Sequence, residues 1–403
     1  MANIDPAQID VLSNMAYVNG PPHEQLQWLR ENQPMFHQKI DDPIMVGESY
    51  VVTRHADIVQ VSRDLDHFGN FAGHNLRNDH NLDAISHMLM ADRPRHTELR
   101  LMASRTFTPK VVKRYTAHYH HLAGTLLDRA VPEGTFDVVD KLAIELPMQA
   151  IVELMGSSLD DTDRLLEWSN ATISSLDPDY APTADARDKA LGEMAAYAME
   201  LAADRTANPQ DDVATALVEH LNDGSLTELE YMGYVILVFV AGNETTRNNI
   251  SWGIHGLATN PDQYALLRSD PDRYLDGAVE EITRWASPVN YMSRTVHQPT
   301  ELLGQEMNVG DKVALMYLSG NRDADVFVDP FRFDITRDPN PQIAFGYGVH
   351  FCMGAHLARL ETKALLAELV KRVERLEMAG EVEHTWSSFI NGIKRLPITV
   401  HKG

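Results

Sequence analysis

The residue of this chain best suited to metal chemistry is its single cysteine, Cys352, in the glycine-rich stretch FGYGVHFCMG from Phe345 to Gly354. One cysteine cannot form an intrachain disulfide or a cysteine-based zinc cluster, but its thiolate can bind one soft metal ion or act as a nucleophile. Glycines at 346, 348 and 354 allow tight turns and let N–H groups point at the sulfur. The helix-forming run AHLARLETKALLAELVKRVERL follows, so Cys352 is predicted to precede a helix N-terminus, which lowers a thiol pKa. A buried structural cysteine in a glycine-rich turn is the alternative.

The spacing Phe-x-x-Gly-x-x-x-Cys-x-Gly resembles the loop that carries the proximal haem ligand in cytochromes P450. The resemblance implies a mainly α fold with small β-sheets, in which residues 1–403 form one large domain around a buried haem b. It implies Cys352 as the iron ligand and Phe345, Gly346 and Gly354 as haem-binding residues. Thiolate ligation of a haem favours cleavage of the O–O bond. The resemblance therefore implies a haem-thiolate monooxygenase that inserts one oxygen atom from O₂ into a C–H bond.

A second group of reactive side chains lies in the sequence AGNETT, residues 241–246, midway along a helix predicted over about 229–259. Glycine and threonine are poor choices for a helix centre, and a threonine there can bond back to the carbonyl four residues earlier. The pattern resembles the acid–alcohol pair of the same family, which implies Glu244 and Thr245 beside the iron and Gly242 leaving room for O₂. Reduction of O₂ consumes two protons, which a hydroxyl and a carboxylate can relay. The alternative is that Gly242 serves helix packing and Glu244 is solvated.

Four cationic or histidine side chains fit the two haem propionates, which need donors when they are buried. His96 and Arg100 are four residues apart, on one face of a predicted helix. The family resemblance implies that they bind propionates together with Arg294 and His350. The alternative for each histidine is an ordinary surface residue, since the chain has 18.

The sequence Glu-x-x-Arg at Glu281 and Arg284 could be a weak surface ion pair. Its position before a Ser-Pro turn, upstream of the cysteine loop, matches the scaffold pair of the family. The resemblance implies that both residues are buried and joined by either Arg332 or Arg337.

The overall composition is acidic, with a net charge of −23 over 403 residues, which argues against nucleic acid or an anionic membrane as partner. We find no linker, repeat or low-complexity segment. The N-terminus lacks the basic and apolar regions of a signal peptide, and the longest apolar run, residues 234–242, is too short to span a bilayer. We therefore expect a cytoplasmic protein without a membrane anchor.

Periodicity predicts mostly helices and a few short strands, which excludes an alternating βαβ fold. Helices are expected at 24–32, 55–64, 95–131, 140–155, 160–175, 184–206 and 229–259, and strands at 50–53, 293–303 and 312–318. The stretches 71–90 and 175–185 are expected to be connections.

No G-x-G-x-x-G sequence indicates a flavin or nicotinamide domain, so we expect electrons from a separate iron–sulfur ferredoxin with its NAD(P)H-dependent reductase. A basic patch is expected to dock the ferredoxin, formed by Arg100, Arg105, Lys110, Lys113, Arg114, Arg359 and Lys363. The alternative enzyme class is a haem-thiolate peroxygenase or isomerase, which needs no external electron supply. Such members of the family usually lack the threonine of the acid–alcohol pair, whereas Thr245 is present here. A haem sensor or carrier would not need the group at 242–245.

The predicted substrate is hydrophobic, a steroid, terpenoid or branched lipid, with a small monoterpenoid or aromatic as the alternative. Segments that line the distal pocket in the family are apolar and rich in methionine here, at 88–90, 236–240, 289–292 and 389–390. The sequences AGNETTRN and FINGIK are similar to members that hydroxylate steroids and branched lipids. Asn290 or Ser388 could bond a single ketone or hydroxyl.

Overall fold

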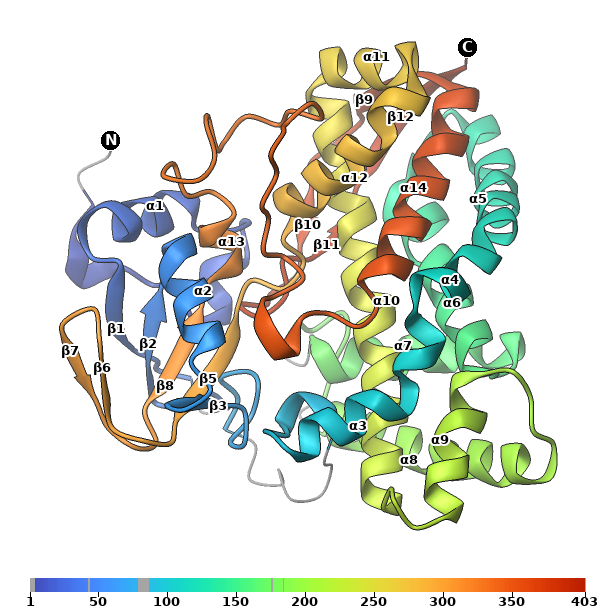
Figure 1. The fold of residues 1–403 in the computed structure, drawn as a ribbon. Helices are drawn as coiled ribbons and strands as arrows, with labels where there is room; N and C mark the ends of the chain where they lie inside the picture. Colours follow the sequence, from blue (N-terminus) through green and yellow to red (C-terminus); the bar gives the residue numbers. More distant parts are fainter. Residues whose placement is uncertain (1–3, 43, 79–86, 175–176, 184, 403) are drawn as a thin grey trace.

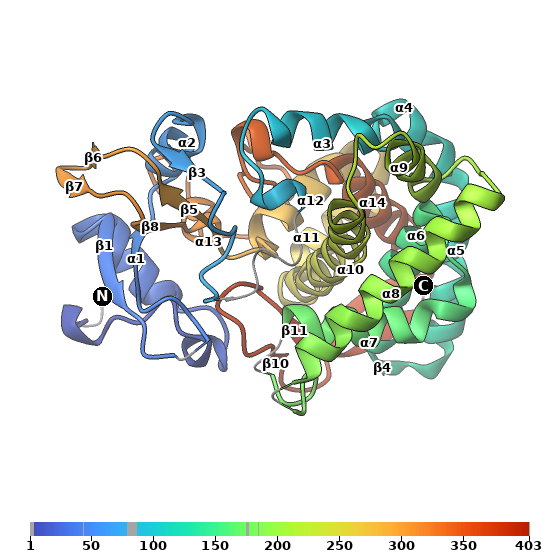
Figure 2. The same ribbon diagram turned by 90° about the horizontal axis from the view of Figure 1, so that it is seen from below.

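The computed structural model describes residues 4–42, 44–78, 87–174, 177–183 and 185–402 (Figure 1). Helices fill one side of the molecule and the largest β-sheet lies on the other, with the long helix α10, Glu228–Thr259, between them. Seen from below, α10 runs between α3 on one side and α7 and α8 on the other (Figure 2). The predicted mainly α fold with small sheets is confirmed. None of the described helices is both long and apolar enough to cross a membrane.

The α-helices are α1 His23–Asn32, α2 His55–Arg63, α3 Arg95–Ser104, α4 Pro109–Val112, α5 Thr116–Ala130, α6 Glu145–Met155, α7 Thr162–Ile173, α8 Ala186–Ala207, α9 Val213–Asn222, α10 Glu228–Thr259, α11 Pro261–Ser269, α12 Pro271–Ala286, α13 Tyr317–Gly320 and α14 Ala355–Arg372. The strands are β1 Met35–Lys39, β2 Glu48–Val52, β3 Phe68–Gly69, β4 Thr135–Asp137, β5 Met292–Val296, β6 Thr300–Leu302, β7 Gln305–Met307, β8 Lys312–Leu315, β9 Val373–Met378, β10 Glu383–His384, β11 Ile393–Arg395 and β12 Pro397–Lys402.

The largest sheet has the strand order β1-β2-β8-β5-β3. The β2–β8 pair is parallel, with Tyr50 opposite Val313, and the other pairs are antiparallel. A second sheet, β4-β12-β9, returns the C-terminal strand to the helical side. The largest sheet therefore lies beside the helical part of the molecule and does not form its centre.

Helix α10 begins with a capping box, which the sequence Thr227-Glu-Leu-Glu230 predicts. The Thr227 hydroxyl accepts from the Glu230 N–H at 3.2 Å, and a Glu230 oxygen accepts from the Thr227 N–H at 3.0 Å. These bonds satisfy donors that a helix N-terminus leaves unpaired. At the helix centre the Thr245 hydroxyl donates to the Ala241 carbonyl at 2.8 Å, as expected.

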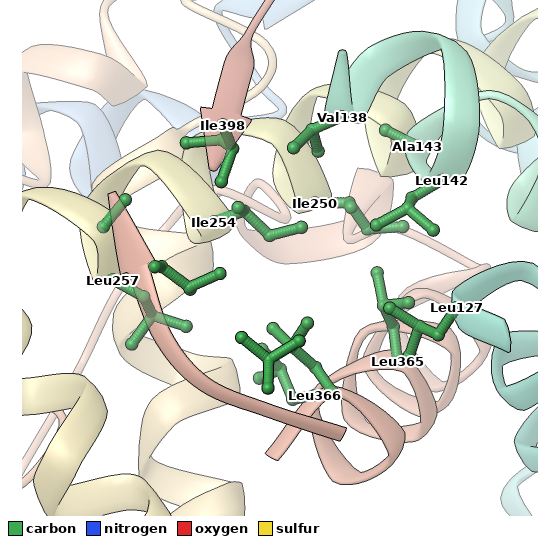
Figure 3. Close-up of a cluster of buried hydrophobic side chains, with 14 of the residues drawn as sticks. Leu127, Val138, Leu142, Ala143, Ile250, Ile254, Leu257, Leu365, Leu366 and Ile398 are labelled. Atoms are coloured by element: carbon green, nitrogen blue, oxygen red, sulfur yellow. The ribbon is translucent and has the colours of Figure 1, made fainter. Parts of the chain in front are cut away.

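The main apolar core lies where α5, α10, α14 and β12 meet (Figure 3). Leu127 of α5, Ile250 and Ile254 of α10, Leu365 of α14 and Ile398 of β12 pack together there and are almost fully buried. Burial of a large aliphatic side chain contributes roughly 1.5–3 kcal/mol. This core holds α10 and α14, which both reach the candidate site, in a fixed relation.

Two helix predictions differ from the structure. The helix expected over 95–131 is divided into α3, α4 and α5 by 3₁₀ turns, and Pro109 begins α4 because proline is favoured at a first helical position. The helix expected after Gly354 ends at Arg372, since Val373–Met378 pairs with β12 as strand β9. Part of the two predicted connections, residues 79–86, 175–176 and 184, lies outside the described residues.

The predicted scaffold pair is fully buried, and Arg337 is the arginine that joins it. Glu281 accepts from Arg284 at 2.7 and 2.8 Å and from Arg337 at 3.2 Å. Arg332 contributes only its backbone carbonyl, which accepts from Arg284 at 3.2 Å, while its side chain is 61% exposed. The sequence left these two arginines undecided because both lie in irregular chain.

Substitution of the two arginines should therefore have unequal effects on stability. We expect Arg337→Ala to lower the free energy of unfolding by about 1.5–3 kcal/mol, because it removes a hydrogen bond to a buried carboxylate. Arg332→Ala should change it by less than about 0.5 kcal/mol. Thermal and urea denaturation of the two variants, side by side, would measure the difference, and equal effects would contradict the assignment.

Candidate active site

A cavity of about 260 Å³ lies between the cysteine loop, the centre of α10 and strand β5. Most of its wall is apolar, and Cys352 lines it. The other predicted cofactor-binding residues that line it are Arg100, Arg294, Phe345, Gly346, His350 and Gly354. The structure thus brings together residues that are more than 250 positions apart in the sequence.

The cysteine loop is held by its own backbone. The Cys352 N–H donates to the Phe345 carbonyl at 2.9 Å, and the loop enters α14 three residues after Cys352. Gly346 and Gly348 both have φ of +74°, where side chains are strained. A Cβ at Gly348 would also lie 2.7 Å from the Ser62 carbonyl oxygen. These two positions therefore require glycine.

The surroundings of Cys352 act on its thiol in opposite directions. Enclosure within the protein raises the pKa of Cys352, whereas the N–H groups of Gly354 and Ala355 and the cations Arg100 and Arg359 lower it. The N–H groups belong to the start of α14, as the sequence predicted. Donors and positive charge directed at a sulfur stabilise a thiolate ligand.

The predicted propionate-binding residues form one cluster. The rings of His96 and His350 lie 4.2 Å apart between their centroids, and Arg100 and Arg294 line the cavity beside them. Burial, with Arg100 next, lowers the pKa of His96 to about 4, and burial, with Arg294 next, lowers that of His350 to about 2. Both nitrogens of His96 and Nδ1 of His350 are buried and have no hydrogen-bond partner among the described residues.

Such a cluster of unpaired donors and cations fits a buried dianion. The two propionates of a haem have this charge and chemistry, so the residues fit the expected cofactor. Tyr317, which the sequence reasoning missed, also lines the cavity and hydrogen-bonds Arg294. Tyr317 lies two residues after β8, and no motif in the sequence marks it as a cavity residue.

The centre of α10 presents Gly242 and Thr245 to the cavity. A Cβ on Gly242 would lie 2.7 Å from Cδ1 of Ile151, which also lines the cavity. Gly242 therefore permits close packing of α6 on α10, which was the alternative reading of this glycine, as well as space at the cavity wall. The role of both residues in catalysis remains a prediction.

Glu244 does not line the cavity, unlike its predicted position beside the iron. It is fully buried and ion-paired with Arg247, and Asn248 Nδ2 donates to the same oxygen at 3.0 Å. Its second oxygen, Oε2, has no hydrogen-bond partner in the part of the chain that the structure describes. Arg247 in turn donates to Asn170 at 2.8 Å and lies 5.4 Å from the ring centroid of Tyr180.

Arg247 is thus the counter-charge of the buried Glu244, a role that the sequence did not predict. The i, i+3 spacing of Glu244 and Arg247 was the available signal. Asn243 is also fully buried, and no described residue hydrogen-bonds either polar atom of its side chain.

Nine residues of the four predicted substrate-facing segments line the cavity. They are Met88, Leu89, Leu237, Val238, Val240, Val289, Met292, Phe389 and Ile390. Asn290 and Ser388, the expected polar anchors, do not: the Asn290 amide donates to the Ser388 carbonyl at 3.0 Å, and both residues are buried away from the cavity. The Asn290 amide therefore bonds to the backbone of the C-terminal segment.

The predicted basic patch is smaller than expected. Arg114, Arg359 and Lys363 form ion pairs with Asp211, Glu280 and Asp276, respectively. Arg100 donates to the Phe351 carbonyl at 2.7 Å beside the cavity.

The other three predicted cations remain exposed. Arg105, Lys110 and Lys113 have no acidic partner within the described chain. Arg105 directly follows α3, Lys110 lies in α4 and Lys113 directly follows α4. Helix α4 packs against α14. Leu101 and Phe351, 64% and 41% exposed, lie in the adjoining α3 and cysteine loop.

Comparison with known proteins agrees with this geometry. The family model for cytochrome P450 matches residues 11–387. The chain is 40% identical over 382 residues to a methyl-branched lipid omega-hydroxylase of Mycobacterium tuberculosis, covering 92% of this chain and 89% of that protein. It is 36% identical over 405 residues to a steroid C26-monooxygenase of Mycolicibacterium smegmatis, covering 96% and 93%.

A solved structure, that of Mycobacterium marinum cytochrome P450 CYP268A2 in complex with pseudoionone, superimposes with a TM-score of 0.92 at 34% identity, covering 99% of this chain and 100% of that one. The two sequence relatives are oxygenases, which favours an enzyme over a haem sensor or carrier. The chain belongs to the cytochrome P450 family and is a haem-thiolate monooxygenase that uses O₂ and a redox partner.

Proposed function

We propose that this P450 hydroxylates a sizeable, mostly hydrocarbon substrate of the steroid, terpenoid or methyl-branched lipid class. The observation that carries the proposal is the wall of the cavity, which is built from aliphatic, methionine and aromatic side chains on four separate segments. Arg100 and Arg294, the cations that line it, belong to the propionate cluster. Methionines at 88 and 292 make the wall adaptable to branched or ring-shaped hydrocarbons. The names of the two mycobacterial relatives, a branched-lipid and a steroid hydroxylase, support the same class.

The cofactor in this proposal is haem b, with Cys352 as its axial ligand and His96, Arg100, Arg294 and His350 at its propionates. When bound, the haem supplies activation of O₂ and transfer of one oxygen atom to the substrate. The apolar wall excludes water and leaves few groups that can deliver protons to the cavity.

The protein supplies protons through α10 in this proposal. The Thr245 hydroxyl lines the cavity and donates to the Ala241 carbonyl, so its oxygen can accept a hydrogen bond from a proton donor there and orient it. Glu244 lies behind it, and Oε2 is its oxygen free to take up a proton, because Arg247 and Asn248 hold the other.

The proposed redox partner is a small acidic iron–sulfur ferredoxin with its NAD(P)H-dependent reductase. Arg105, Lys110 and Lys113 supply unpaired positive charge on an acidic chain, and Leu101 and Phe351 add exposed apolar surface beside it. This charge–apolar combination suits a weak, rapidly formed complex. The cytoplasmic location stays a prediction from the sequence.

Optical titration tests the substrate class. We expect steroids, terpenoids and methyl-branched fatty acids to shift the spin state of the ferric enzyme, and small charged aromatics to bind at least about tenfold more weakly, since the wall offers them no counter-charge. Cys352→Ser is the control for the haem-thiolate spectrum, which it should abolish. Tight binding confined to small aromatics would contradict the substrate proposal and leave the monooxygenase assignment intact.

The role of Thr245 can be separated from helix stability with a matched pair of variants. Thr245→Ala should bind substrate normally but form about tenfold less product per NADH, because proton delivery is disturbed, with the remaining electrons recovered as peroxide or water. Thr259→Ala removes the same type of bond, from a threonine hydroxyl to the His255 carbonyl at 2.8 Å, at the far end of α10, and should leave the yield unchanged. Equal yields in both variants would contradict the role.

Charge reversal tests the docking surface. Lys113→Glu should slow reduction by ferredoxin several-fold at low salt, and the effect should shrink as ionic strength rises, because screening weakens charge complementarity. Lys189→Glu is the control, on α8, which lies across α10 from α3 in Figure 2. Reduction rates that respond to neither substitution nor salt would exclude this surface.

A further inference from the structure

A second, much smaller cavity lies inside the main apolar core, where α10, α12 and α14 meet. The apolar wall of this core void is formed by Ile250 and Ile254 of α10, Ile282 of α12, and Leu365 and Leu366 of α14. In Figure 3 the two isoleucines of α10 face the two leucines of α14. The volume of the void is about 10 Å³, close to the smallest space that holds one water molecule. Its occupant must therefore be a single small molecule.

The core void adjoins the active-site cavity along all three helices. On each helix, one residue of the cavity wall is directly next in sequence to a residue of the void wall. These pairs are Asn249 and Ile250, Thr283 and Ile282, and Glu361 and Thr362. Neighbouring residues differ by only about 1.5 Å along a helix axis, and the Asn249 amide donates to the Thr362 hydroxyl at 3.0 Å, from the cavity wall to the void wall. One layer of side chains therefore separates the two spaces.

The wall of the core void offers little to a water molecule. Thr362 is the one polar residue among the described residues that line it. Its hydroxyl already accepts from Asn249 and donates to the Ala358 carbonyl at 2.8 Å. A buried water needs about two to four hydrogen-bond partners, whereas apolar cavities stay dry and bind apolar gases such as xenon. The void therefore favours a small apolar molecule over water.

The space is kept open by a glycine in the interior of α10. Gly253 lines the void, and a Cβ at this position would lie 2.8 Å from Cγ2 and 3.0 Å from Cδ1 of Ile282. Glycine is otherwise a poor residue for a helix interior. A larger residue at 253 would displace the Ile282 side chain, so the missing side chain preserves both the close packing of α10 on α12 and the void between them.

We propose that the core void is a docking site for dioxygen, the apolar gas that the enzyme consumes. Of the molecules that the reaction takes up, O₂ is the one that is both about as small as water and apolar. A molecule of O₂ held in the void waits one layer of side chains away from the cavity, which raises the effective concentration of O₂ there. The inference applies to any organic substrate, so it goes beyond the substrate class proposed above.

Crystals of the haem-loaded enzyme under krypton pressure test the site directly, since krypton is an apolar atom with a strong anomalous signal. We expect a krypton site in the void of the unaltered enzyme and several-fold lower occupancy in Gly253→Ala, because the added methyl group and the displaced Ile282 side chain fill the space. Gly256→Ala is the matched control on the same helix. Its Cβ would approach Cε2 of Phe333 to 3.0 Å, a similar crowding, but Gly256 does not line the void. Gly256→Ala should therefore keep the krypton site.

The second readout is the dependence of product formation on O₂ concentration. Gly253→Ala should raise the KM for O₂ several-fold and leave kcat at saturating O₂ unchanged, and Gly256→Ala should change neither. If Gly253→Ala does not fold, Leu366→Ala, which enlarges the void, should raise the krypton occupancy and lower the KM for O₂.

Absence of krypton from the void in both the unaltered enzyme and Leu366→Ala would show an ordinary packing void and overturn the proposal. A KM for O₂ that ignores the loss or gain of krypton would overturn it as well, because the void would then bind gas without supplying the cavity. The krypton measurement needs no organic substrate, so its failure is distinct from a failure of the proposed substrate class.

Discussion

The buried ion pair between Glu281 and Arg284 is the interaction on which the active site depends. Arg284 donates to the carbonyls of Asn321 and Pro330, and Glu281 accepts from the Asp334 N–H and the Asn340 amide. These bonds fix the course of residues 321–340, a segment that has little regular secondary structure. A buried ion pair is stable only when its remaining donors and acceptors are satisfied, and here the irregular segment satisfies them.

That segment leads directly to the cysteine loop. Asn321 Oδ1 accepts from the Ile343 N–H at 2.8 Å, and the Ile343 carbonyl accepts from the Gly346 N–H at 2.9 Å. A continuous series of hydrogen bonds therefore connects α12 with the loop that presents Cys352. The position of the thiol is fixed by polar contacts within the segment, and the apolar core fixes α10 and α14 on either side.

The sequence predicted what local rules determine. The glycines around Cys352, the capping box of α10 and the bond from Thr245 to Ala241 each follow from neighbouring residues. It did not predict contacts that depend on distant segments. The Glu244 side chain is paired with Arg247, which is anchored by Asn170 of α7. Three of the seven basic residues form ion pairs with acids on other segments, Asp211 before α9 and Glu280 and Asp276 on α12. The choice of Arg337 over Arg332 likewise depends on how an irregular chain folds back on α12.

The contact between Arg247 and Tyr180 has a consequence beyond the ion pair itself. Arg247 is held by Asn170, near the end of α7, and faces Tyr180 in the chain that follows. Asn170 and Tyr180 do not line the cavity. A displacement of α7 or of that chain would nevertheless alter the counter-charge of Glu244, because the arginine would lose part of its support. The electrostatic environment behind the oxygen-binding turn is therefore set by segments whose own sequences carry no catalytic group.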